Sequence, residues 1–183
     1  MKTESMVKYV ARLAITLLLI TSLVAAALAG VNAITAPIIA QINYQKTQDA
    51  IEAVLPGGGE SVPFTDDSGW VSTVYKSETG YAVEITPTTG FDGDIAMMVG
   101  IDLQGNVLGI SVISHTETAG LGAVAAAKTS AGEAFRGQFV GTSGSVSVAK
   151  DGGTIDAITG ATITSRAICD GVNAALACIA NMG

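Results

Sequence analysis

The N-terminal part of the chain is dominated by one long apolar stretch. No charged residue occurs between Leu13 and Gln45, and residues 13–29 are almost wholly apolar. An α-helix needs about 20 predominantly apolar residues to cross the hydrocarbon core of a bilayer. The pattern therefore predicts one transmembrane helix over residues 13–36.

The charges that flank this stretch predict its orientation. Three basic residues precede it: Lys2, Lys8 and Arg12. Because basic residues concentrate on the cytoplasmic side of membrane spans, we expect residues 1–12, including Met1, to lie in the cytoplasm. The chain after Lys46 then lies outside the cytoplasm, and the protein is a single-pass protein of the cell membrane in contact with its lipid.

A cleaved signal peptide is the alternative interpretation of this stretch. Residues 25–30 offer an Ala-x-Ala cleavage pattern after a basic N-terminal region. The apolar run continues past that site as far as Ile39, which is longer than a signal peptide requires. A retained anchor is therefore favoured.

The helical pattern extends beyond the predicted span. After Pro37, apolar residues recur at helical spacing as far as Val54, and residues 56–59 read Pro-Gly-Gly-Gly. This predicts an amphipathic helix that ends before Pro56, so that residues 37–60 form a stalk helix and linker.

Residues 61–183 have the pattern of a folded α+β domain. Four β-like segments separated by short turns predict an antiparallel sheet: residues 70–75, 81–85, 95–102 and 107–114. Two further strands are predicted over residues 143–149 and 155–158, and helices over residues 123–135 and 165–180. We expect one antiparallel sheet with flanking helices on one side.

The charge of this domain excludes some partners. After Lys46 there are five basic and fifteen acidic residues, a net charge of −10. Such a surface repels nucleic acid, so nucleic-acid binding is excluded.

The chain has two cysteines, Cys169 and Cys178. Nine residues apart on one helix, they point to opposite faces and cannot pair within it, so we expect two buried residues. The chain lacks the ligands for a metal or iron–sulfur site of its own.

Residues 156–162 read Asp-Ala-Ile-Thr-Gly-Ala-Thr, with a hydroxyl at the end and small residues at Gly160 and Ala161. A phosphoester requires a hydroxyl acceptor, and small residues allow close approach to the backbone. Thr164 and Ser165 are candidate N-caps of the final helix, whose positive end would favour a phosphate. The alternative is a plain strand–turn–helix connection.

This stretch resembles the flavinylation signature Asp-x-x-(Ser/Thr)-Gly-Ala-Thr. The resemblance implies that a flavin transferase joins FMN through its phosphate to the hydroxyl of Thr162, with Thr159, Gly160 and Ala161 beside the cofactor. It also implies that Asp156 serves recognition by the transferase, through the magnesium ion that such enzymes use. The alternative for Asp156 is a surface turn residue.

A second stretch, residues 115–122, reads His-Thr-Glu-Thr-Ala-Gly-Leu-Gly. It is similar to the His-x-Glu-Thr-Pro-Gly-Leu-Gly segment that accompanies the signature in FMN-binding subunits of the Rnf and Na+-pumping quinone reductase complexes. Ala119 stands where the family has proline, which puts the rigidity of the loop in doubt. The resemblance implies five further flavin contacts: Glu117, Thr118, Gly120, Leu121 and Gly122.

Two other residues invite a functional interpretation that the pattern does not support. His115 is the only histidine, but a strand-end histidine without a Ser or Cys partner is typical of a structural residue. Trp70 lies on a predicted strand, where a lone tryptophan is more often a core residue than a flavin neighbour. We therefore expect no catalytic side chain.

Over essentially its whole length the chain resembles the RnfG family, the FMN-binding G subunits of Rnf electron transport complexes. The resemblance implies a covalent FMN-carrying subunit that relays electrons on the extracytoplasmic side of an ion-translocating ferredoxin:NAD+ oxidoreductase. Its partners are then the other membrane and peripheral subunits, and the flavin transferase during maturation. The coupling ion, Na+ or H+, stays open.

Three alternatives also stay open: the FMN-binding C subunit of a Na+-translocating NADH:quinone reductase, a free-standing flavin domain for extracellular electron transfer, and an anchored module without a cofactor.

Overall fold

The computed structural model describes residues 2–182, with side chains from Met6 onward. The predicted cytoplasmic position of Met1 therefore lies outside the described residues. The chain divides into two compact units, residues 1–45 and residues 46–183.

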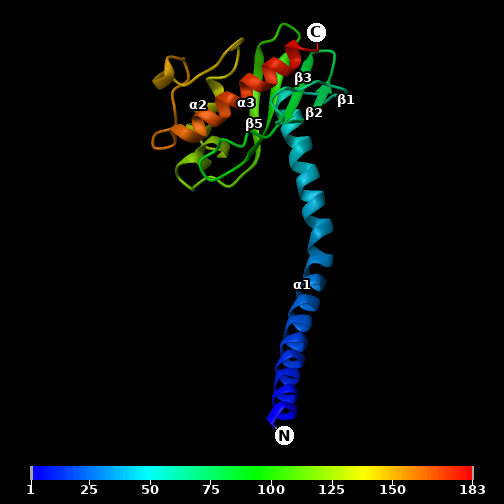
Figure 1. Cartoon of the computed structure of the whole chain (residues 1–183). Helices are drawn as coiled ribbons and strands as arrows, with labels where there is room; N and C mark the ends of the chain where they lie inside the picture. Colours follow the sequence, from blue (N-terminus) through cyan, green and yellow to red (C-terminus); the bar gives the residue numbers. More distant parts are fainter. Residues whose placement is uncertain (1, 183) are drawn as a thin grey trace. The chain divides into compact units, whose positions relative to one another are not determined.

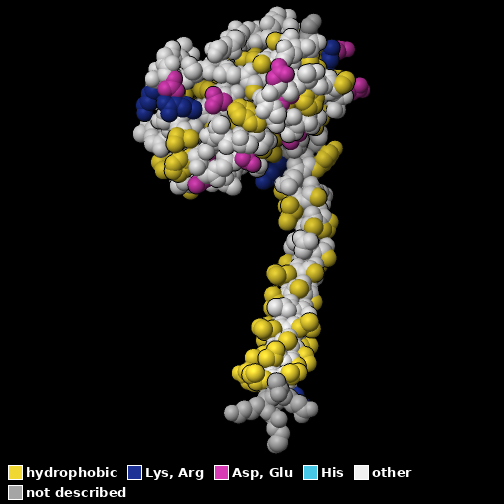
Figure 2. Space-filling view, viewed as in Figure 1, with side chains coloured by type: hydrophobic (Ala, Val, Ile, Leu, Met, Phe, Trp, Pro, Cys, Tyr) yellow, Lys and Arg dark blue, Asp and Glu magenta, His cyan; other side chains and the backbone are white. Residues whose placement is uncertain are grey.

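One long helix begins in the first unit and ends in the second. Helix α1 (Lys2–Val54) continues through Pro37 and ends before Pro56, as the sequence predicts. Its large apolar side chains are exposed along the first unit (Figure 2). Thr16, Thr21 and Thr35 donate their hydroxyls to carbonyl oxygens one turn earlier, at 2.8, 2.9 and 3.0 Å. Such internal bonds satisfy hydroxyls where no water is present.

Helix α1 is long and apolar enough to cross a membrane. The mean hydropathy of its most apolar 18-residue stretch is 2.4. Helix α3 (Thr162–Ala180) is also long and apolar enough to cross a membrane. However, 56% of its most apolar 18-residue stretch is buried inside the second unit. It is therefore a core helix. The limits of the membrane span and the retention of the anchor stay predictions.

The second unit is built on a five-stranded sheet in the order of the chain (Figure 1). All neighbouring strands are antiparallel. The predicted α+β class with an antiparallel sheet is therefore confirmed. The strands are β1 (Glu60–Val62), β2 (Val71–Lys76), β3 (Gly80–Ile85), β4 (Ile95–Asp102) and β5 (Val107–His115).

Both faces of the sheet are covered. On one face α3 packs over the strands, and Cys169 and Cys178 are buried there as free thiols. On the other face the last turns of α1 pack Ile51 and Val54 against Ala82 and Met98. The prediction of helices on one side is therefore wrong. The reason is that β4 is apolar on both sides and needs cover on both.

The segment between β5 and α3 differs most from the prediction. The expected helix over residues 123–135 is split into the 3-10 helix η1 (Gly122–Ala126) and α2 (Ser130–Gly137). Thr129 separates them because its side chain accepts a bond from Gly132 N at 3.3 Å and caps α2.

The prediction of two strands over residues 143–149 and 155–158 is also wrong. In the described chain this region holds one parallel bridge, Val148 to Ile155, around the short 3-10 helix η2 (Ala149–Asp151). The turn after η2 uses Gly152 in the left-handed conformation. Trp70, expected in the core, is half-buried and packs against it.

Candidate functional site

The two sequence motifs form two turns of the same kind. In the first, Leu121 N donates to Thr118 O at 3.2 Å. In the second, Ala161 N donates to Ile158 O at 2.9 Å. The third residue of each turn is a glycine with positive φ, +76° at Gly120 and +77° at Gly160. This is the pattern of a type II turn, in which proline is favoured at the second position. Ala119 occupies that position in the first turn.

The turns meet through a side chain of the first motif. The Cδ2 atom of Leu121 lies 3.0 Å from the place that a Cβ atom on Gly160 would occupy. Together with its positive φ, this contact explains why the second turn requires glycine.

Between the turns lies a cleft of about 290 Å³, here called the motif cleft. It is lined by seven of the nine predicted cofactor-binding residues and by four others. The predicted seven are Glu117, Thr118, Leu121, Gly122, Gly160, Ala161 and Thr162, and the others are Phe91, Lys150, Ile163 and Thr164.

Glu117 ties three segments together behind the motif cleft. It is buried, at 7% exposure. Its Oε1 atom accepts from Phe91 N at 2.8 Å and Asp92 N at 3.3 Å, and its Oε2 atom accepts from Thr164 Oγ1 at 2.6 Å. A side chain on Gly122 would collide with Glu117 and Thr164. Glu117 therefore orders the loop of the first motif against the loop of Phe91 and the start of α3.

Thr118 and Thr116, both exposed, also bond to the loop that carries Phe91 and Asp92. The hydroxyl of Thr118 donates to Asp92 Oδ2 at 2.9 Å, and Thr116 Oγ1 donates to Asp92 O at 2.7 Å. The loop that carries Phe91 is thus fixed at several points by the first motif.

Thr162 is the first residue of α3 and is half-buried. The prediction that Thr164 and Ser165 are N-caps of this helix is wrong, because both residues lie inside its first turn. The hydroxyl of Thr164 donates to Glu117 Oε2. Ser165 Oγ donates to Ala161 O at 2.9 Å and accepts from Ile158 N at 3.0 Å. The N-cap position is occupied by Ala161, which makes no side-chain capping bond in the described structure.

Lys150 is a neighbour of Thr162 that the sequence does not indicate. Its Nζ atom donates to Thr162 Oγ1 at 3.2 Å. Next to it, Asp151 accepts two bonds from Arg166, at 2.6 and 2.8 Å. These hydrogen bonds hold the pKa of Asp151 below its usual value, so the carboxylate stays ionised to a lower pH.

Exposed apolar side chains form a rim around the motif cleft. Phe91, Ile163 and Leu121 are 64%, 45% and 43% exposed. Of these, only Leu121 was predicted. Large apolar side chains left exposed on a folded domain often mark a binding site when they gather around a cleft.

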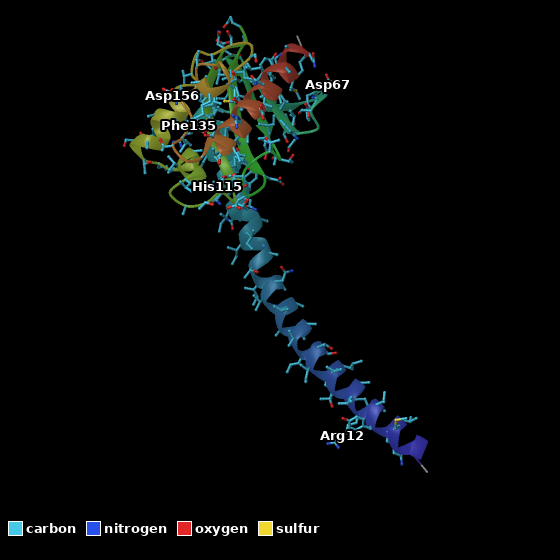
Figure 3. The ribbon with its side chains drawn as sticks, turned by 60° about the vertical axis from the view of Figure 1, so that its left-hand side comes forward. Arg12, Asp67, His115, Phe135 and Asp156 are labelled. Carbon is cyan, nitrogen blue, oxygen red and sulfur yellow. The ribbon has the colours of Figure 1, made fainter. Side chains whose placement is uncertain are left out.

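Three predicted residues do not line the motif cleft. Gly120, Thr159 and Asp156 lie in a neighbouring depression beside Phe135, here called the Asp156 hollow. Figure 3 shows Asp156 and Phe135 on the same side of the second unit. Thr159 lies there because it precedes the left-handed Gly160, where the chain reverses.

The backbone of Asp156 is fixed while its carboxylate is exposed. Asp156 N donates to Gln138 Oε1 at 2.7 Å, and Gln138 Nε2 donates to Asp156 O at 3.2 Å.

His115 ends β5 and is half-buried, with its Nδ1 atom buried and unpaired in the described structure (Figure 3). It does not line the motif cleft.

Comparison with known proteins places this geometry in a family. Residues 90–177 match the family described as FMN-binding domain. The chain is 32% identical over 96% of its length to the G subunit of the Na(+)-translocating ferredoxin:NAD(+) oxidoreductase complex of Acetobacterium woodii, covering 94% of that protein. The chain belongs to the RnfG family, the G subunits of ion-translocating oxidoreductase complexes.

Other members of the RnfG family are similarly related. The G subunit of the ion-translocating oxidoreductase complex of Methanosarcina acetivorans is 31% identical, with 92% of this chain and 94% of that protein covered. The G subunit of the proton-translocating ferredoxin:NAD(+) oxidoreductase complex of Clostridium ljungdahlii is 32% identical, with 81% and 80% covered. The relatives' names differ in the ion, so they leave the coupling ion undecided.

Family membership confirms several predictions. The cofactor is FMN, and the subunit takes part in electron transfer within an oxidoreductase complex. Relatives that belong to membrane complexes and the apolar α1 together indicate a membrane-anchored protein.

The residues of the motif cleft fit FMN. Phe91, Leu121 and Ile163 offer apolar surface to a flavin ring, while Thr162 and Lys150 offer a hydroxyl and an ammonium to a phosphate. The volume of about 290 Å³ is at the lower limit of small-molecule sites, which span roughly 300–1,000 Å³. The motif cleft is therefore suited to hold part of the cofactor.

Proposed function

We propose that FMN is attached covalently through its phosphate to Thr162 Oγ1. The observation that carries this proposal is the placement of three threonine hydroxyls. Thr164 donates its hydroxyl to buried Glu117, and Thr159 lies in the Asp156 hollow. Thr162 is half-buried at the motif cleft, with its oxygen beside an ammonium group.

The small volume of the motif cleft supports a covalent link. A site that encloses only part of a ligand holds it weakly, because ligand pockets usually bury most of the ligand's surface. A phosphoester keeps the cofactor in place without deep enclosure. When bound, FMN supplies the redox chemistry, and the protein orients it and adjusts its potential.

The residues around the motif cleft take separate roles in this proposal. Leu121, Phe91 and Ile163 contact the flavin ring, and Glu117 and Thr118 hold the loops that carry the first two of these residues. Gly122, Gly160 and Ala161 leave space for the cofactor next to the backbone.

Asp156 serves the flavin transferase before attachment. Its backbone is fixed by Gln138, and its exposed carboxylate is free to meet a partner. Because it does not line the motif cleft, it does not repel the attached phosphate at close range. Gly120 and Thr159 lie beside it and belong to the same contact surface.

The subunit relays electrons on the extracytoplasmic side of an ion-translocating ferredoxin:NAD+ oxidoreductase. The names of the relatives support the reaction. The basic residues before Leu13 support the orientation, because they favour a cytoplasmic N-terminus. The other subunits of the complex are then its partners.

Two experiments test the relay and the orientation. A Thr162→Ala subunit should assemble into the complex without its flavin and abolish ferredoxin:NAD+ electron transfer; unchanged electron transfer would refute the relay. For orientation, Glu78→Cys places a thiol on an exposed turn, while the native cysteines are buried. A membrane-impermeant maleimide should label this variant in intact cells. Labelling that requires broken cells would contradict the orientation.

A free-standing flavin domain is the second candidate. Purification of the subunit with its neighbours from membranes distinguishes the two, because a free-standing domain would carry flavin without co-purifying subunits.

A further inference from the structure

We propose that Lys150 binds the phosphate during flavin attachment: its ammonium group pairs with the phosphate that is joined to Thr162. This inference rests on the proposed attachment at Thr162. It adds a second residue to the site, one that lies outside both motifs.

The contact between the two residues has a defined direction. An ammonium group only donates hydrogen bonds, so Thr162 Oγ1 is the acceptor in the 3.2 Å contact. The positive charge therefore lies beside the oxygen that forms the ester. It also lies within reach of the phosphate oxygens that the ester brings to this position.

The local fold holds the backbone of Lys150 near Thr162. Lys150 belongs to η2, and the next residue, Asp151, is bonded twice to Arg166 on α3. Arg166 lies one helical turn after Thr162 and so projects from the same side of α3. This pair of bonds ties η2 to the first turns of α3.

Lys150 is also the only basic residue among the described residues that line the motif cleft. The chain after Lys46 carries a net charge of −10. The one acidic side chain in the lining, Glu117, has both oxygens engaged inside the protein. Arg166, one turn further along α3, is already paired with Asp151, so Lys150 is the unpaired cation that a phosphate at Thr162 meets in the lining of the motif cleft.

The attachment step shows where the charge acts. Thr162 Oγ1 forms a bond to the phosphorus of a flavin nucleotide anhydride, and the phosphoanhydride bond breaks. The leaving nucleotide takes the electron pair of that bond, and the hydroxyl proton passes to a base of the transferase or to water. Nothing is oxidised or reduced. During this step negative charge is spread over the equatorial oxygens of the phosphoryl group that reaches Oγ1, and Lys150 stabilises this charge.

The test measures the rate of attachment to the full-length protein in detergent, with purified flavin transferase and flavin adenine dinucleotide. Flavin that survives denaturation is quantified by in-gel fluorescence. Lys150→Gln should attach flavin about tenfold more slowly at an unchanged melting temperature, a factor that equals ~1.4 kcal/mol. Lys150→Arg should restore most of the rate. Lys128→Gln, an exposed lysine away from the motif cleft, is the matched control and should behave as wild type.

Salt provides a readout that a structural role would not move. Charge pairs at exposed positions weaken as ionic strength rises, so the ratio of wild-type to Lys150→Gln rates should shrink in high salt. Arg166→Gln should slow attachment less than Lys150→Gln, because it only loosens η2.

A wild-type rate in Lys150→Gln would overturn the proposal, as would an equal slowing in Lys150→Arg with a lowered melting temperature. Flavin on Thr162→Ala, measured in parallel, would instead refute the attachment site itself.

Discussion

Replacing Glu117 by alanine should destabilise the second unit substantially. The buried carboxylate accepts from Phe91 N at 2.8 Å, from Asp92 N at 3.3 Å and from Thr164 Oγ1 at 2.6 Å. These donors come from the loop before β4 and from the first turn of α3. The alanine variant removes the acceptor for all three donors and leaves a void between the two segments.

The cost follows from these contacts. A hydrogen bond to a charged group contributes about 1.5–3 kcal/mol. The bond to Asp92 is long, and water can replace the carboxylate at the exposed loop of Phe91, so the bond to buried Thr164 dominates. We expect a loss of about 3 kcal/mol in the free energy of unfolding. For a domain of this size that lowers the melting temperature by roughly 10 °C.

Thermal unfolding of the detergent-solubilised protein, followed by circular dichroism, measures this loss. Two controls separate burial from the chemical change. Glu78→Ala removes an exposed carboxylate from a turn, and Thr118→Ala removes the exposed bond to Asp92. Both should change the stability by less than about 0.5 kcal/mol. If Glu117→Ala melts within about 2 °C of wild type, Glu117 does not hold the loops together and this account of its role is wrong.

Three further outcomes follow from the turns and the core. Ala119→Pro should raise the free energy of unfolding by about 0.4–1 kcal/mol in a denaturant titration, because proline suits the second position of a type II turn; a loss of stability would contradict the turn assignment. Gly160→Ala should cost about 1–2 kcal/mol in the same titration, because its φ is +77° and Leu121 lies against it; unchanged stability would contradict it. Burial raises the pKa of Cys169 to about 12 and also raises that of Cys178, so few thiolates exist at about pH 8. Iodoacetamide should modify neither cysteine until the protein is unfolded, and rapid modification of the native protein would show that the core assignment is wrong.

Much of the fold was predictable because the strands have short turns and apolar patterns of their own. Strands β2 to β5 begin and end within one residue of the predicted bounds. Strand β1 was not predicted because it has only three residues, two of them exposed. Such a short segment shows no alternation of apolar and polar residues. The packing of α1 on the second face of the sheet was not predicted. Strand β4 indicates it, because Ile95 to Ile101 is apolar on both sides.

The site was predictable where its residues are contiguous in the chain. The two motifs supply seven residues of the motif cleft lining. Phe91 and Lys150 reach it from other segments, and only the tertiary fold brings them there. Thr164 and Ser165 were misassigned as caps because their residue types favour that role. In the structure their hydroxyls serve Glu117 and the second turn.

The central claim is tested most directly by the mass of one peptide. Trypsin cuts after Lys150 and Arg166, so peptide 151–166 contains five hydroxyl side chains: Thr154, Thr159, Thr162, Thr164 and Ser165. In protein produced with a flavin transferase and then denatured, we predict that this peptide carries the mass of FMN less one water, that fragmentation places the increment on Thr162, and that Thr162→Ala removes it. An unmodified wild-type peptide, an increment on any hydroxyl residue other than Thr162, or an increment that persists in Thr162→Ala would contradict the account.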